Sequence, residues 1–150
     1  MERNRSRCYA AFSLVEVVVV LAIIGTIAAI ALPRYGFALE RYRASSAYDR
    51  VVADIERIKR LARATGTSWT IVFDNPGTRY RMYQGEFGDV SDASSMESVS
   101  LDDPPYNAEI TRVSIAGGDY ITFDMYGEPT SSGGIEIQSG RLAYVVSIGN

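Results

Sequence analysis

The sequence contains no histidine, which removes the side chain that most often acts as a general base or binds a metal ion. Two serine nucleophile patterns are missing too, because neither a Ser-x-x-Lys nor a Gly-x-Ser-x-Gly arrangement occurs. The single cysteine, Cys8, excludes an intramolecular disulfide, so thiol pairing does not indicate the compartment. We therefore expect a protein that is not an enzyme and that has no cofactor or metal.

Long runs of basic residues are absent as well. The formal net charge is −3, from 15 Lys and Arg against 18 Asp and Glu. Phosphate binding requires several Lys or Arg together, and Arg141 is the only cation near the C-terminus. Nucleic acid is therefore not an expected partner. With 150 residues and 47% hydrophobic content, the chain can form one ordinary globular domain.

The sequence does have a long apolar run behind a basic N-terminus. Arg3, Arg5 and Arg7 precede the run, and the 17 residues 17–33 carry no charge. Together with residues 12–15 the run would form a helix of about 30 Å, which is long enough to cross a bilayer. The basic flank predicts that the N-terminus is cytoplasmic.

Glu16 interrupts the apolar run near its start. An isolated charge inside such a segment costs about 2.5–3.5 kcal/mol on insertion scales. A secretory signal has a small-residue cleavage site after its apolar part, and residues 28–31, Ala-Ala-Ile-Ala, could imitate one. A plain signal peptide or anchor gains nothing from Glu16, and this argues against that alternative.

The residues from Ala11 to Glu16, with the apolar run that follows, resemble the prepilin-type N-terminal methylation motif of type IV pilins and type II secretion pseudopilins. That motif has a small residue, then Phe, then Glu four positions later. The resemblance implies that prepilin peptidase cleaves between Ala11 and Phe12 on the cytoplasmic side and that Phe12 is then N-methylated. The family usually has Gly before the cleaved bond, so Ala11 departs from the pattern by one methyl group.

The resemblance also implies roles within the retained helix. In a filament of staggered subunits, the Glu16 carboxylate would approach the N-terminal ammonium of Phe12 in a neighbour, and the opposite charges would relieve each other's burial cost. Gly25 and Pro33 would mark a section that kinks or partly melts when the subunit leaves the membrane, since Gly lowers helix propensity and Pro removes a hydrogen bond. Taken alone, Pro33 fits the end of a membrane helix equally well.

After Pro33 the apolar spacing predicts an amphipathic helix that ends at Gly66. Six residues recur at alternating steps of four and three: Ala44, Tyr48, Val51, Ile55, Ile58 and Ala62. Four charged residues are expected on other faces: Arg50, Asp54, Arg57 and Lys59. We therefore divide the chain into a leader (1–11), a transmembrane and filament-core helix (12–33), an amphipathic helix (34–66) and a β head (67–150).

The head is predicted to be an antiparallel sheet. The period changes to two at 69–73, and a turn at 75–77 leads into 80–83, which predicts a hairpin. Further strands are expected at 109–115, 120–124, 135–138 and 142–148. Residues 84–105, rich in Gly, Ser, Pro and carboxylates, are predicted to be an exposed loop. The predicted fold class is α+β, with a long N-terminal helix packed on the sheet in a pilin-like manner.

The C-terminal part resembles the head of H-type minor pseudopilins and FimT-like minor pilins. The resemblance rests on residues 121–127, in which Phe123 and Gly127 form a Phe-x-x-x-Gly pattern, and on the two closing strands that follow. FimT-like proteins have been linked to DNA binding through basic residues near the C-terminus. This C-terminus, residues 147–150, lacks them.

Two groups of side chains in the head admit a second interpretation. Five carboxylates could bind Ca²⁺, although their spacing matches no EF-hand and a solvated acidic loop is the better interpretation: Asp89, Asp92, Glu97, Asp102 and Asp103. Three tyrosines could serve an interface, although strand tyrosines more often belong to the core or the strand surface: Tyr80, Tyr83 and Tyr126.

The resemblance implies a minor pseudopilin or pilin subunit of a type II secretion or type IV pilus machine. The subunit would cross the bacterial inner membrane once, with a periplasmic head, and assemble through Phe12 and Glu16. Its implied partners are prepilin peptidase, other pilin or pseudopilin subunits, the inner-membrane assembly platform and, before assembly, membrane lipid. The alternatives are a FimT-like minor pilin for pilus priming or DNA uptake, and a membrane-tethered binding domain that does not polymerise.

Overall fold

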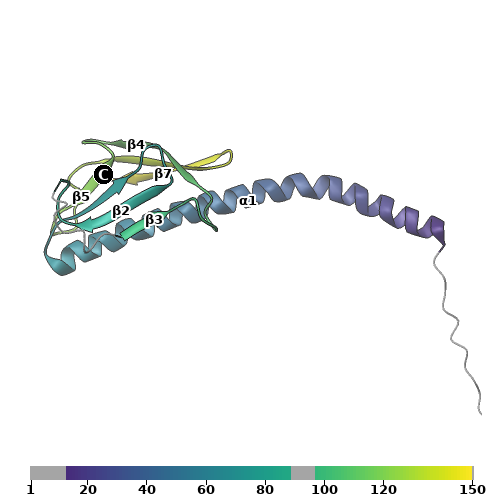
Figure 1. The fold of residues 1–150 in the computed structure, drawn as a ribbon, viewed down its shortest axis with the longest axis horizontal. Coiled ribbons are helices and arrows are strands. Elements are labelled where there is room, and N and C mark those ends of the chain that lie inside the picture. The colour runs from purple at the N-terminus through teal and green to yellow at the C-terminus, as the bar shows by residue number, and fades with distance from the viewer. Residues whose placement is uncertain (1–12, 89–96, 150) are drawn as a thin grey trace, which may run out of the picture. The chain divides into compact units, whose positions relative to one another are not determined.

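The computed structural model of the protein describes residues 13–88 and 97–149. The first element is the helix α1, Leu14–Thr65, which contains 52 residues (Figure 1). By its contacts the chain divides into two compact units, Met1–Phe37 and Ala38–Asn150. The predicted helix is therefore confirmed, and it ends one residue before Gly66, whose N–H donates to the carbonyl of Ala62 at 2.9 Å.

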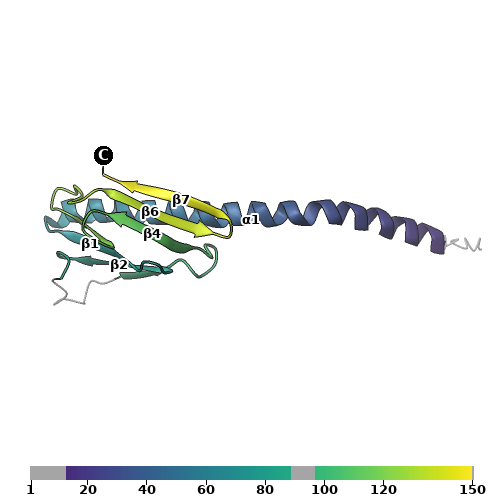
Figure 2. The same cartoon turned by 90° about the horizontal axis from the view of Figure 1, so that it is seen from above.

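The second unit contains two antiparallel sheets instead of the single predicted sheet. The described strands are β1 (Trp69–Phe73), β2 (Arg79–Gln84), β3 (Glu97–Ser100), β4 (Glu109–Ile115), β5 (Tyr120–Phe123), β6 (Gly133–Ser139) and β7 (Leu142–Ile148). The first sheet has the order β3-β2-β1-β5 and the second has the order β4-β6-β7. Seen from above, the three strands of the second sheet lie side by side (Figure 2). The predicted hairpin is β1–β2, in which Ile71 pairs with Met82.

One hydrophobic core joins both sheets to the part of α1 that belongs to the second unit. The predicted stripe contributes Val51, Ile58 and Ala62, all at most 1% exposed. The first sheet adds β1, β2 and β5 side chains, including Phe123, and the second adds β4, β6 and β7 side chains, including Ile137. The apolar period of α1 therefore selects the face that packs on the sheets.

The prediction of an exposed loop over residues 84–105 holds for residues 86–88 and 102–105 but is wrong for residues 97–101. Residues 97–100 form β3, which pairs with β2, and Val99 and Leu101 join the core. The N–H of Leu101 donates to the carbonyl of Thr78 at 2.7 Å. Four residues are too few to show a clear alternating pattern among serines and carboxylates, so their pairing with β2 determines the strand.

The Phe-x-x-x-Gly pattern forms a turn that contacts the C-terminal end of α1. The Asp124 carboxylate accepts hydrogen bonds from the N–H groups of Tyr126 and Glu128, both at 2.9 Å. Arg63 of α1 donates to the carbonyl of Tyr126 at 2.7 Å. Gly127 has a φ of +75°, and a β-carbon there would lie 2.8 Å from the carbonyl oxygen of Lys59. Both the backbone conformation and the close approach to α1 therefore require glycine at this position.

Candidate functional site

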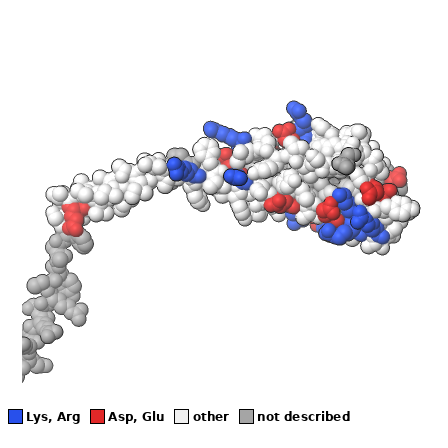
Figure 3. Space-filling view, turned by 180° about the vertical axis from the view of Figure 1, so that it is seen from behind, with Lys and Arg blue, Asp and Glu red and all other residues white. Residues whose placement is uncertain are grey.

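The first unit presents an apolar helix whose side chains are exposed. Within α1, an 18-residue window has a mean hydropathy of 2.7 with none of it buried, so the helix is long and apolar enough to cross a membrane. In Figure 3 this stretch is white, apart from red where the helix begins. Exposed apolar surface of this extent marks a membrane or protein contact. Its large exposed residues include Leu14, Val18, Leu21, Ile24, Ile27 and Ile30.

Glu16 lies in the first turn of this helix and is exposed. The N–H of Val17 donates to the carbonyl of Ser13 at 3.2 Å, so the helical hydrogen bonds begin directly beside it. The spacing Ser13-x-x-Glu16 is that of a capping box, in which both side chains would bond to backbone N–H groups. Within residues 13–88 and 97–149, neither side chain makes such a bond. A local helix cap therefore does not account for the carboxylate.

The helix surface beside Glu16 is apolar. Glu16 shares the lining of an open groove of about 260 Å³ with Val17, Val20 and Leu21. The helix N-terminus stabilises a nearby carboxylate by roughly 0.3–1 kcal/mol in exposed sites.

The remaining residues of the predicted assembly site are placed as follows. Ala11 and Phe12 lie outside the described residues, so cleavage and methylation there remain predictions. Gly25 and Pro33 lie inside α1, which continues through both positions. The alternative that Pro33 ends the helix is therefore wrong, while a kink at Gly25 or Pro33 remains a prediction.

The second unit contains a buried polar cluster that the sequence did not reveal. The Asp54 carboxylate accepts hydrogen bonds from the Tyr80 hydroxyl at 2.5 Å and from the Arg50 guanidinium at 2.8 Å. Asp54 is 5% exposed and Tyr80 is 1% exposed. The expectation that Asp54 lies on another face is wrong, because the carboxylate is buried beside the core stripe. Tyr80 belongs to the core, as the preferred interpretation of the strand tyrosines had it, and not to an interface.

Burial and hydrogen bonding keep the Tyr80 hydroxyl and the Arg50 guanidinium protonated. Burial raises the pKa of the Tyr80 hydroxyl, and the hydrogen bond to Asp54 raises it further, because both disfavour the phenolate. The hydrogen bond to Asp54 likewise raises the pKa of Arg50. The cluster therefore connects α1 to β2 as a fixed structural contact.

We expect Tyr80→Phe to change the alkaline stability of the head. The pKa of Tyr80 is higher in the folded state than its unfolded value of about 10, so its contribution is complete below pH 10 and is lost as pH rises above it. Above pH 10 the wild type should therefore lose about 1.4 kcal/mol per pH unit more than Tyr80→Phe. Urea unfolding at pH 8 to 11.5, followed by Trp69 fluorescence, measures the free energy of unfolding of both proteins. If that free energy fell equally with pH in wild type and Tyr80→Phe, the prediction would be contradicted. Burial also raises the pKa of Tyr83, but both proteins contain it.

The other predicted residues of the head are not gathered into a site. Glu97 pairs with Arg57 at 2.7 Å, and Asp89 and Asp92 lie outside the described residues. Among the residues that the structure does describe, no group of three or more carboxylate, thiol or imidazole side chains could hold a metal ion. Of the remaining two tyrosines, Tyr83 is 7% exposed and belongs to the interior, whereas Tyr126 is 66% exposed.

Comparison with known families finds a match at the N-terminal segment that contains Glu16. Residues 6–32 match the family model described as the prokaryotic N-terminal methylation motif. Neither the curated proteins nor the solved structures included a match to the chain. The motif and the exposed apolar helix together support a type IV pilin-like subunit with membrane anchoring, and they imply processing by prepilin peptidase and assembly with other pilin subunits.

Proposed function

We propose that the chain is a minor pseudopilin or minor pilin subunit of a type II secretion or type IV pilus machine. It acts by polymerisation and not by catalysis. Before assembly it crosses the bacterial inner membrane once with its head in the periplasm, and afterwards its N-terminal helix lies in the filament core. The assembly platform of the inner membrane transfers it from one state to the other.

The observation that carries this proposal is Glu16. It is an exposed carboxylate without a capping hydrogen bond within the described residues, in the first turn of an apolar helix, inside a matched methylation motif. A charge at such a place is unfavourable unless a counter-charge meets it. The N-terminal ammonium of Phe12 in a neighbouring subunit is the counter-charge that processing would create.

A tether that never polymerises would need no such carboxylate. The two closing strands β6 and β7 and the turn at Gly127 support the further assignment to an H-type minor pseudopilin head. Secretion and pilus machines differ in their companion subunits. The chain can be cross-linked to its neighbours in the cell envelope and purified. Mass spectrometry of the proteins that co-purify with it would then distinguish a secretion machine from a pilus machine.

The proposal predicts the mass of the mature protein. Intact mass spectrometry of the chain from its native cell envelope should give the mass of residues 12–150 plus one methyl group. A Phe12→Ala variant, analysed beside it, reports how far processing depends on the residue after the cleaved bond. Cleavage after Ala31, or an uncleaved chain, would contradict the proposal and indicate an exported or membrane-tethered domain.

A further inference from the structure

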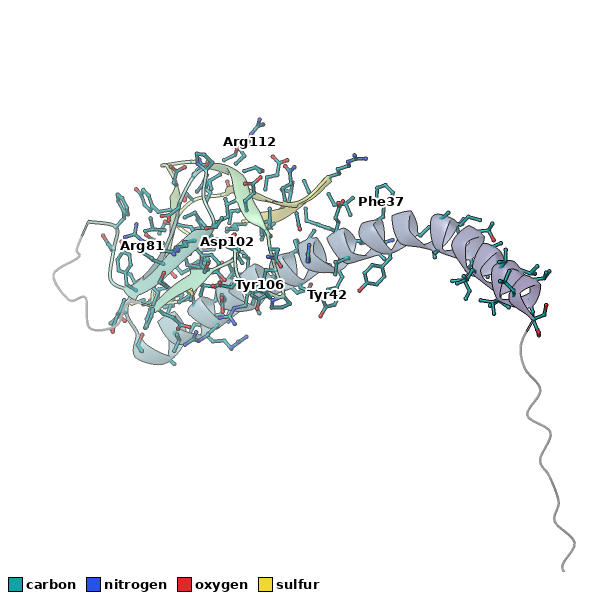
Figure 4. All side chains as sticks on the ribbon, turned by 45° about the vertical axis from the view of Figure 1, so that its right-hand side comes forward. Phe37, Tyr42, Arg81, Asp102, Tyr106 and Arg112 are labelled. Carbon is teal, nitrogen blue, oxygen red and sulfur yellow. The ribbon has the colours of Figure 1, made fainter. Side chains whose placement is uncertain are left out.

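The uncharged part of α1 is followed by a group of basic and aromatic residues, Arg34, Tyr35 and Phe37. The proposed assembly through Phe12 and Glu16 gives these residues no role. Arg34 follows the run directly, and Tyr35 and Phe37 are 70% and 56% exposed. With 3.6 residues per turn, Tyr35 lies about 100° to one side of Arg34 and Phe37 about 60° to the other. The three residues therefore cover one broad face of the helix, and Phe37 projects away from it (Figure 4).

The spacing between this group and Glu16 matches the thickness of a membrane. Arg34 lies 18 residues after Glu16, which is five full turns and a rise of about 27 Å. The hydrocarbon core of a bilayer is about 30 Å thick. When Arg34 lies at one boundary of the hydrocarbon core, Glu16 therefore lies at the opposite boundary and on the same face of the helix.

The chemistry of the group fits a lipid headgroup region. Tyrosine is enriched at membrane interfaces because its ring is apolar and its hydroxyl needs water. A guanidinium forms paired hydrogen bonds with phosphate oxygens. The charge complementarity between Arg34 and a phosphodiester favours phospholipid as the occupant of this face, because a neighbouring apolar helix would leave the cation without a partner.

We propose that Arg34, Tyr35 and Phe37 form an interfacial collar that binds phospholipid headgroups of the periplasmic leaflet and sets the depth of the unassembled subunit. The collar holds Glu16 at the cytoplasmic boundary of the bilayer, where water can solvate its carboxylate. The cost of burying Glu16 then arises only on assembly, when the counter-charge is present. This inference rests on the membrane topology of the proposed function.

The test measures the depth of the helix in vesicles of phosphatidylethanolamine and phosphatidylglycerol. The full-length chain, with Cys8→Ser and Val18→Cys, carries an environment-sensitive fluorophore at position 18. Lipids spin-labelled at the headgroup or at mid-chain quench this fluorophore according to its depth. The variant Arg34→Gln/Tyr35→Leu/Phe37→Leu removes the collar and adds no charge, so the helix still inserts. Tyr42→Leu is the matched control, because Tyr42 is an aromatic residue of the second unit and is 61% exposed.

Without the collar, the uncharged stretch is longer, and this should let the helix shift toward the cytoplasmic side. We expect headgroup quenching relative to mid-chain quenching to rise about twofold in the triple variant and to stay unchanged in Tyr42→Leu. An inserted triple variant with unchanged depth would overturn the inference; if its filament incorporation were also lost, the collar would be a subunit contact instead. Alkaline extraction of every variant from the vesicles would overturn the topology, and the inference with it.

Discussion

Replacing Glu16 by alanine is expected to abolish incorporation of the chain into filaments while membrane insertion is retained. Removing one member of a buried ion pair typically costs about 3–5 kcal/mol, because the other charge remains buried without a partner. At each subunit contact this corresponds to an affinity loss of roughly 10²-fold to several thousand-fold. Insertion should not suffer, because alanine removes a charge from an apolar helix. Quantitative immunoblots of the sheared filament fraction and the membrane fraction measure the two effects separately.

A relocated carboxylate serves as the matched control for this prediction. In Glu16→Ala/Val20→Glu the charge stays on the same helix, one turn later and in the lining of the same groove. We expect no rescue, because the counter-charge in a staggered neighbour lies at a defined height. Rescue would show that assembly needs a carboxylate in this part of the helix but not at the height of residue 16. Wild-type incorporation of Glu16→Ala itself would show that this carboxylate does not hold the filament together.

Asp54→Ala should destabilise the head more than the replacement of an exposed carboxylate of α1. The substitution leaves the Tyr80 hydroxyl buried without its acceptor, which costs about 1–3 kcal/mol, and it also removes the hydrogen bond from Arg50. The Arg50 side chain is 37% exposed and can return to water, which limits its share. We therefore expect a loss of about 2–4 kcal/mol in the free energy of unfolding.

Urea unfolding in detergent measures this loss through the single tryptophan, Trp69, which packs against the core. Asp49→Ala is the control, because Asp49 is an exposed carboxylate of the same helix and should change stability by less than about 0.5 kcal/mol. Equal effects of the two substitutions would mean that Asp54 is hydrated in solution. The double variant Asp54→Ala/Tyr80→Phe should recover part of the loss, since the unpaired hydroxyl is then absent.

The long helix and most strands could be predicted because their signals are local. The apolar stripe from Ala44 to Ala62 follows the helical period and reaches the core as predicted. The strand β2 was expected at 80–83 and extends one residue further at each end, while β6 begins two residues earlier than expected. These differences arise because backbone pairing with a neighbouring strand, and not side-chain pattern, decides where a strand ends.

By itself the sequence determined the character of the N-terminal segment, because the basic flank, the Phe12 and Glu16 pattern and the apolar run are contiguous. An apolar run can be identified from its hydropathy alone, without knowledge of its contacts. Only the tertiary structure decided that Asp54 is buried, that β3 exists and that the head has two sheets. Each of these depends on a residue far along the chain, such as Tyr80 for Asp54 and β2 for β3. Burial depends on how the whole chain packs. A carboxylate on a predicted helix, such as Asp54, is therefore assigned to solvent until its distant hydrogen-bond donor is known.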